Sequence, residues 1–265
     1  MSLQTPRVSI VVPAYNEARR LPRSLPALTR LAGEGAELII VDDGSSDDTM
    51  AVARAGLGHL PSVSLMRLPR HVGKGAAVRA GVERSAGRSI AYMDADLATD
   101  VSCLPGLLAA LRHYDVAIGS RSVPGAVIEA ARWHRRFGGR LFNNVTQRLT
   151  RLPLQDTQCG FKAFRAPVGK LLFGLSRVNG FAFDVEILTV ARRLGLRIGQ
   201  VPVRWIDVNG SHIRPMRDPL IMVRDVALTA ARWRERGGPA SYALDEADGV
   251  IAPFPRASDA EHGAI

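Results

Sequence analysis

Short apolar runs alternate with longer amphipathic segments over residues 1–120. The runs are continuously apolar, which is typical of strands buried on both faces. The expected strands are 8–12, 37–41, 63–68, 90–93 and 116–118. The expected helices are 21–31, 73–85 and 104–111. A further helix is expected to follow Ser46 as its cap, with Asp47 and Asp48 in its first turn. This order predicts an α/β fold with a mostly parallel central sheet and helices on both faces.

The pattern changes after residue 120. Arginines alternate with aromatic and aliphatic residues over 128–151 and again over 219–236, which predicts basic amphipathic helices. A strand is expected at 161–164, and a helix beginning near residue 181. We therefore expect one domain over 1–236, with a ligand-binding half at 1–120 and a second half at 121–236. The Gly-, Pro- and Asp-rich segment 237–265 is expected to be disordered.

Composition narrows the class of protein. A chain of 265 residues with 46% hydrophobic residues has room for one large α/β domain or two small ones. Two cysteines are too few for a disulfide framework or a zinc site, which fits a reducing compartment. Residues 1–7 do not have the pattern of a signal peptide. No apolar stretch reaches the roughly 20 residues that a membrane-spanning helix needs. The net charge of +10 favours anionic partners: nucleic acid, phospholipid or a phosphorylated substrate.

Polar clusters follow the expected strands at the point where each one ends. In a parallel sheet these ends share one edge, and ligands bind there. Asp94 and Asp96 follow one strand directly, and two like charges there require a neutralising partner. Carboxylate oxygens suit Mg²⁺ or Mn²⁺, so the pair predicts a metal-bound diphosphate. The alternative is a helix cap and a solvated turn.

Six further segments carry candidate chemistry, and most of them have a structural alternative. Tyr15 and Glu17 fit a nucleobase and its ribose, or a strand-to-helix turn. Asp43 fits a base or ribose hydroxyl, or an Asp-Gly turn. Lys74 and Gly75 open a helix, where backbone amides favour phosphate.

The other three segments lie in the second half. Asp156 stands in a loop with Cys159, whose thiol we expect to be buried rather than nucleophilic. Asp184 fits either a general base or an acid in the first turn of a helix. His212 and Arg214 form a polar loop with the chemistry to hold an anion.

Together these segments resemble an inverting family 2 glycosyltransferase of the GT-A fold over about residues 7–236. The resemblance rests on the order of eight blocks: VVPAYNE, VDDGSSDDT, GKG, DADLATD, GSR, DTQCGFK, FDVEIL and NGS. It is greatest to enzymes that move a sugar onto a polyprenyl phosphate, and among these to the dolichyl-phosphate β-glucosyltransferases. Mannosyl-type relatives usually carry a Gln soon after the Asp-x-Asp, where this chain has Leu97-Ala98-Thr99.

The resemblance implies a role for each candidate residue. Nucleotide-sugar contacts are implied for Pro13, Tyr15, Glu17, Asp43, Lys74, Gly75, Asp94 and Ala95. Metal ligation is implied for Asp94 and Asp96, with Mg²⁺ or Mn²⁺ as the ion. Catalytic roles are implied for Asp96, Asp156 and Arg121, and contacts to an acceptor phosphate for Arg121, Arg214 and His212.

The function implied is transfer of glucose from UDP-glucose to a polyprenyl phosphate, with inversion, by a peripheral protein on the cytoplasmic face of a membrane. Two alternatives stay open: a mannosyltransferase using GDP-mannose, and a GT-A transferase with a soluble acceptor. Nucleic-acid binding is disfavoured because the strand-end acids would repel phosphates. Processive polysaccharide synthesis is disfavoured because the sequence contains neither a Gln-x-x-Arg-Trp block nor an expected spanning helix.

Overall fold

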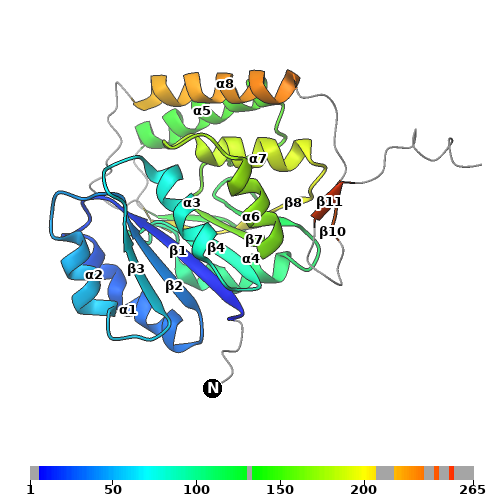
Figure 1. The fold of residues 1–265 in the computed structure, drawn as a ribbon. Helices are drawn as coiled ribbons and strands as arrows, with labels where there is room; N and C mark the ends of the chain where they lie inside the picture. Colours follow the sequence, from blue (N-terminus) through cyan, green and yellow to red (C-terminus); the bar gives the residue numbers. More distant parts are fainter. Residues whose placement is uncertain (1–5, 130–132, 207–217, 236–241, 245–250, 254–265) are drawn as a thin grey trace, which may run out of the picture.

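A seven-stranded sheet forms the centre of the computed structural model, which describes residues 6–129, 133–206, 218–235, 242–244 and 251–253. Its strand order is β3-β2-β1-β4-β7-β5-β8 (Figure 1). The strands are β1 (Val8–Ala14), β2 (Glu37–Asp42), β3 (Val63–Arg67), β4 (Ser89–Met93), β5 (Val116–Ser120), β7 (Phe161–Arg165) and β8 (Ile198–Pro202). Neighbouring strands pair in parallel except around β7, so the predicted mostly parallel sheet is confirmed.

Strand β7 runs against both of its neighbours for a reason visible in its preceding loop. Gly160, the residue before β7, lies against the Asp94 carboxylate at the carboxyl end of β4. The chain therefore enters β7 at the edge where β4 ends and must run away from it. The helical pattern of 128–151 could not reveal this reversal.

Helices cover both faces of the sheet, and two further helices form an outer layer (Figure 1). One face carries α3 (Lys74–Arg84), α6 (Ala166–Leu175) and α7 (Phe183–Arg193); the other carries α1 (Leu21–Gly33), α2 (Thr49–Leu57) and α4 (Leu104–Ala110). Helices α5 (Trp133–Thr150) and α8 (Asp218–Glu235) pack on each other, and α8 packs on α7. Every residue of β1 is buried, as expected for a strand covered on both sides.

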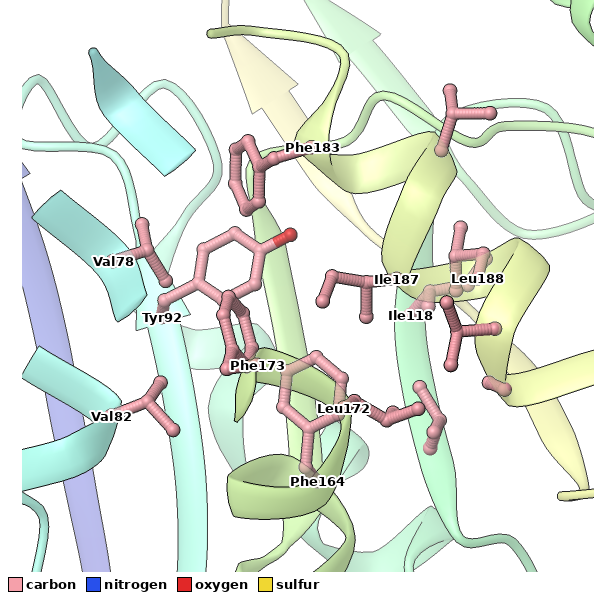
Figure 2. Close-up of a cluster of buried hydrophobic side chains, with 14 of the residues drawn as sticks. Val78, Val82, Tyr92, Ile118, Phe164, Leu172, Phe173, Phe183, Ile187 and Leu188 are labelled. Carbon is pink, nitrogen blue, oxygen red and sulfur yellow. The ribbon is translucent and has the colours of Figure 1, made fainter. Parts of the chain in front are cut away.

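The core beneath α3, α6 and α7 is rich in aromatic rings. Tyr92 lies among Val78, Phe173 and Phe183 (Figure 2). Its ring centroid is 5.6 Å from that of Phe183 and 6.3 Å from that of Phe173, distances typical of favourable aromatic pairs. The Tyr92 hydroxyl donates to Asp184, so this core extends to a buried polar cluster at its upper end.

Short elements complete the described part of the chain. They are the 3₁₀ turn Val101–Cys103, the parallel pair β6 (Val127–Glu129) and β9 (Arg204–Ile206), and the antiparallel pair β10 (Tyr242–Leu244) and β11 (Ile251–Pro253). The last pair lies within the segment expected to be disordered, whose remaining residues are outside the described ones. Among the helices that the structure describes, none combines the length and apolar content that crossing a bilayer demands.

Helix α2 begins three residues later than its expected Ser46 cap. The backbone N–H of Ser46 donates to Asn16 Oδ1 at 2.9 Å, so Ser46 belongs to a loop tied to the end of β1. Asp47 accepts from the backbone N–H of Thr49 at 3.0 Å and of Ala18 at 3.1 Å. The prediction that Ser46 caps α2 was wrong, because Ser46 forms its hydrogen bonds with Asn16 in the loop after β1.

Candidate active site

The candidate site lies where β1, β2, β4 and β5 end. Their parallel directions bring Tyr15, Asp43, Asp94 and Arg121 to one edge of the sheet, each directly after its strand or one residue later. The loops after β1 and β2 are joined by backbone hydrogen bonds, from Asn16 to Ser45 Oγ (2.9 Å) and from Glu17 to Thr49 Oγ1 (2.7 Å). The predicted clustering of these loops is therefore seen in the structure.

Asp43 organises the loop that leads into α3. Its carboxylate accepts from the backbone N–H groups of Val72 (2.9 Å) and Gly73 (2.8 Å), and lies 2.8 Å from His71 Nδ1. The His71 ring stacks on that of Tyr15, with centroids 3.8 Å apart. Tyr15 and Asp43 thus form one wall with His71, a residue that sequence reasoning had not assigned a role.

Lys74, the first residue of α3, reaches the carboxylate at the end of β4. Its Nζ lies 2.5 Å from Asp94 Oδ1. Burial alone would lower the pKa of Lys74, but Asp94 and Asp184 raise it above its ordinary value, so the ammonium stays charged. On the other side of Asp94, a Cβ at position 160 would lie 2.0 Å from Oδ2, which only glycine avoids.

Asp96 shares a half-buried environment with Glu17 and Arg20. Burial, together with the charge of Asp94, raises the pKa of Asp96. Burial also raises the pKa of Glu17 to about 7, against the opposing charge of Arg20. Arg20 Nε donates to Glu17 at 2.7 Å, and its Nη1 lies 3.7 Å from Asp96. Burial in this corner therefore disfavours the charged forms of both carboxyl groups.

The donor chemistry of this corner fits a hard divalent cation. Asp94 and Asp96 offer carboxylate oxygens, and burial together with the charge of Asp94 raises the pKa of Asp96, an effect that a cation held between the two would oppose. Among the residues the structure describes, no three His, Cys, Asp or Glu side chains gather as a metal-binding group. The two aspartates thus fit Mg²⁺ or Mn²⁺ as a partial ligand set, which oxygens of a diphosphate can complete.

Arg121 and Asp156 form a forked ion pair at the end of β5. Arg121 donates from Nε (2.7 Å), Nη2 (2.9 Å) and its backbone N–H (3.0 Å) to the Asp156 carboxylate. Burial would raise the pKa of Asp156, but Arg121 lowers it below its ordinary value. The guanidinium also lies over the ring of Trp205, 5.5 Å from the centroid. The sequence placed both residues near the acceptor; the structure joins them.

A buried trio lies behind Asp94 that sequence reasoning did not assemble. Lys162 is fully buried in β7, and its Nζ donates to Asp184 Oδ1 and to the carbonyl of Cys159, both at 2.6 Å. Tyr92 donates to the same Asp184 carboxylate. Asp184 therefore has two partners and is poorly suited to act as a general base. The available signal was Lys162 itself, since a lysine inside an apolar strand must be paired.

The remaining candidates have mixed outcomes. Pro13 and Ala95 are buried next to the site, and the Ala95 carbonyl accepts from Ser24 Oγ at 2.6 Å. The backbone N–H of Gly75 donates to the Asn179 carbonyl at 2.7 Å. Cys159 is buried, and burial raises the pKa of its thiol, which does not favour a nucleophile. His212 and Arg214 lie outside the described residues.

Known proteins resemble this chain over most of its length. The family model described as glycosyl transferase family 2 matches residues 9–172. A dolichyl-phosphate beta-glucosyltransferase of Dictyostelium discoideum is 32% identical, covering 85% of this chain and 74% of that protein. Proteins of the same name are 34% identical in Drosophila melanogaster (85% and 75%) and 35% identical in Mus musculus (86% and 76%). The predicted resemblance is confirmed.

Solved structures share the fold at low sequence identity. A glucosyl-3-phosphoglycerate synthase of Mycobacterium tuberculosis, in complex with Mn²⁺, UDP and glucosyl-3-phosphoglycerate, has a TM-score of 0.64 at 20% identity (94% of this chain, 88% of that one). A mannosyl-3-phosphoglycerate synthase of Rubrobacter xylanophilus has a TM-score of 0.64 at 17% identity (87% and 74%). The predicted GT-A fold is confirmed by these neighbours.

Proposed function

The chain belongs to glycosyl transferase family 2, and on that basis we propose that it transfers glucose from UDP-glucose to a polyprenyl phosphate, with inversion and with Mg²⁺ or Mn²⁺. The observation that carries the proposal is the meeting of Asp94, Asp96 and Lys74 at the carboxyl edge of the sheet. Relatives named dolichyl-phosphate beta-glucosyltransferase support the acceptor and the sugar. Neighbours of the same fold crystallised with UDP and Mn²⁺ or Mg²⁺ support the donor and the ion.

The chain's own residues prepare the donor. Asp94 and Asp96 would hold the cation, and Lys74 would place its ammonium beside the diphosphate. The ion supplies positive charge that stabilises the diphosphate as it leaves. Tyr15, stacked on His71, offers a flat wall for a base, with Asp43 fixing the loop behind it. Glu17 and Arg20 border Asp96 and limit the space for the sugar.

The acceptor needs positioning more than deprotonation. A phosphate monoester has a second pKa of about 6, so its attacking oxygen is largely deprotonated at neutral pH. Arg121 is the cation at the end of β5, and the Asp156 fork sets its orientation. Asp184 is already bound to Lys162 and Tyr92, so we assign it to positioning rather than to base catalysis. Arg214 and His212 would complete the phosphate site.

The lipid acceptor requires that the enzyme work at a membrane surface, which we place at the cytoplasmic face. The outer layer of α5 and α8 carries arginines and leucines suited to such contact. Attack on C1 from the face opposite the diphosphate converts an α-linked donor into a β-linked product.

The decisive assay offers a panel of nucleotide sugars to the protein with Mn²⁺, with and without a short polyprenyl phosphate. We expect UDP-glucose to react and the lipid phosphate to be required. Asp96→Asn should lower transfer by at least about 100-fold while leaving the circular dichroism spectrum unchanged, since charge stabilisation of the leaving group is lost. Preference for GDP-mannose, or equal transfer to a soluble acceptor, would overturn the proposed donor or acceptor. Near-normal activity of Asp96→Asn would remove the metal role.

A further inference from the structure

A basic cavity of about 500 Å³ lies on the outer layer, away from the strand-end site. It opens where the last turns of α5 and α7 meet the middle of α8, three helices that lie together in Figure 1. Its lining residues are Arg148, Leu149, Thr150, Arg151, Thr189, Arg193, Ala227 and Ala230. Nothing in the transfer chemistry proposed above uses it.

Three arginines border this cavity, and its lining contains no acidic residue. None of Arg148, Arg151 and Arg193 forms an ion pair with a carboxylate in the part of the chain that the structure describes. Two helix C-termini meet here, each with a partial charge of about −0.5. They leave about two of the three positive charges uncompensated. Ala227 and Ala230 keep the interior hollow, because larger side chains would fill it.

A second cavity on the other side of α8 provides a contrast. It measures about 360 Å³ and is lined by three arginines, of which Arg224 and Arg232 have carboxylate partners. Arg224 Nη2 lies 2.9 Å from Asp225, and Arg232 Nη1 lies 3.0 Å from the buried Glu186. Arg224 and Arg232 are thus neutralised within the fold, whereas no arginine of the first cavity pairs with a described carboxylate.

Exposed leucines accompany the first cavity. Leu149, on its rim, is 41% exposed, and Leu220 of α8 is 73% exposed. Leu220 and Ala227 are seven residues apart and so lie on one face of α8, whereas Leu228 (55% exposed) lines the second cavity. Arginine beside exposed leucine is the chemistry of a lipid surface, where the apolar chains enter the interface and the guanidinium groups meet phosphates. A soluble phosphate compound or a nucleic acid would make no use of the leucines.

We propose that the cavity bordered by Arg148, Arg151 and Arg193 binds the phosphate of an anionic lipid headgroup. The fork of an arginine bonds two phosphate oxygens at once, and three arginines around one hollow can surround a phosphodiester. The leucines of α5 and α8 lie in the headgroup region beside it. This inference deepens the proposed lipid-linked function by naming where the chain contacts the bilayer, but its geometry is independent of the transfer site.

The test measures binding to phosphatidylcholine vesicles with and without phosphatidylglycerol. The variant is Arg148→Gln, Arg151→Gln and Arg193→Gln together. The control is Arg54→Gln, Arg84→Gln and Arg192→Gln, which removes the same charge from the last turns of α2, α3 and α7. At about 1 kcal/mol for each basic residue near the bilayer, the variant should bind anionic vesicles about 100-fold more weakly. The control should change by less than about threefold, because none of those three arginines lines the cavity.

Further variants and ligands distinguish among the molecules that the cavity could bind. Leu149→Ser with Leu220→Ser should weaken vesicle binding while leaving the binding of inorganic phosphate unchanged. Equal losses in the arginine variant and its charge-matched control would overturn the cavity as the site. Saturable binding of inorganic phosphate or a short RNA without any preference for anionic vesicles would overturn the lipid headgroup. Thermal melting of each variant verifies that it is folded.

Transfer to a short, detergent-solubilised polyprenyl phosphate distinguishes failure of this inference from failure of the proposed function. The arginine variant should retain that transfer, because the cavity does not touch the strand-end site. Loss of vesicle binding with transfer retained supports the cavity. Transfer lost together with vesicle binding would place these arginines in the reaction instead and overturn the inference.

Discussion

Asp94 shows at the scale of one residue how the site is held. Its carboxylate has an ammonium, Lys74, on one side and the bare backbone of Gly160 on the other. The close approach of Gly160 is possible only because it has no Cβ. The glycine of the DTQCG block thereby determines where a carboxylate of the Asp-x-Asp block can stand, although the blocks are far apart in the sequence.

Replacing Gly160 by Ala should therefore damage the donor site more than the fold. A Cβ 2.0 Å from Asp94 Oδ2 must push the carboxylate aside. We expect UDP affinity in the presence of Mn²⁺, measured by calorimetry, to fall at least about tenfold, equivalent to about 1.4 kcal/mol.

Gly174→Ala in α6 is the matched control, because no atom lies within 4 Å of its added Cβ. It should leave UDP affinity unchanged and stabilise the helix by about 0.5–1 kcal/mol. Unchanged UDP affinity in Gly160→Ala would contradict the proposed place of Asp94.

The Arg121–Asp156 pair predicts a dependence of stability on pH. Arg121 lowers the pKa of Asp156 below its ordinary value, so the unfolded chain binds this proton more readily than the folded one. The stability that the pair contributes is present above the unfolded pKa of about 3.9 and is lost as pH falls through the folded pKa. Asp156→Asn should cost about 3 kcal/mol at neutral pH, because Arg121 stays half-buried without its partner.

Urea unfolding of the wild type and of Asp156→Asn, measured between neutral and acidic pH, checks this prediction. The difference in free energy of unfolding should shrink below about pH 4. Glu34→Gln is the control, since the exposed Glu34 lies 4.0 Å from Arg30 and should change stability by less than about 1 kcal/mol. A constant difference across pH would show that Asp156 does not act through its charge.

At the scale of elements, one buried carboxylate links α8, α7 and the loop that supports α3. Glu186, fully buried in α7, accepts from Ser176 Oγ (2.7 Å) and from the backbone N–H groups of Arg177 (2.8 Å) and Val178 (2.7 Å). Arg232 of α8 donates to its other oxygen at 3.0 Å. The loop so held presents the Asn179 carbonyl to the first amides of α3, directly beside Lys74.

Glu186→Gln should therefore raise the KM for the nucleotide sugar as well as reduce stability. The amide has only one acceptor oxygen for donors on two sides, so a buried donor loses its partner at a cost of about 1–3 kcal/mol. A loosened loop shifts the start of α3, and steady-state kinetics should show the KM rising about tenfold or more, a change of about 1.4 kcal/mol in binding.

Arg232→Gln separates the two effects. It removes the partner from α8 but leaves the three bonds to the loop, so it should destabilise the protein without a comparable change in KM. Equal KM values in Glu186→Gln and the wild type would mean that the loop does not position the donor site.

At the scale of the whole molecule, the site is built from loops of four strands and should respond as a unit to its ligand. The proposed ligands, UDP with Mn²⁺, should bind the folded chain and not the unfolded one, so a concentration 100 times Kd should add about 2.7 kcal/mol to the free energy of unfolding. For a protein of this size, that raises Tm by roughly 5–10 °C.

Scanning calorimetry with UDP and Mn²⁺, with UDP and EDTA, and with Mn²⁺ alone measures this shift. The shift should be largest with both ligands and should be absent in Asp96→Asn. An unchanged Tm at millimolar UDP and Mn²⁺ would contradict the proposed donor and metal together.

Hydrophobic periodicity and short sequence blocks determined the central sheet and many of the candidate site residues. Continuous apolar runs predicted the buried strands, because a strand covered on both faces cannot alternate. Strand ends predicted the shared edge, because parallel strands carry their carboxyl ends to one side. Asp94 was found as a candidate in this way, Lys74 from its place at a helix start and Asp156 from its loop, while the family resemblance implied the role of Arg121.

Only the tertiary structure decided which strands and which charged side chains pair with one another. The antiparallel course of β7 depends on where the preceding loop reaches the sheet, which local pattern does not encode. The Arg121–Asp156 fork, the Asp43–His71 contact and the Lys162–Asp184 pair each join residues from separate elements. The grouping of Arg148, Arg151 and Arg193 likewise needs α7 and α5 to end side by side. Sequence periodicity records which face of an element is apolar, whereas the pairing of charges follows from distances that exist only after packing.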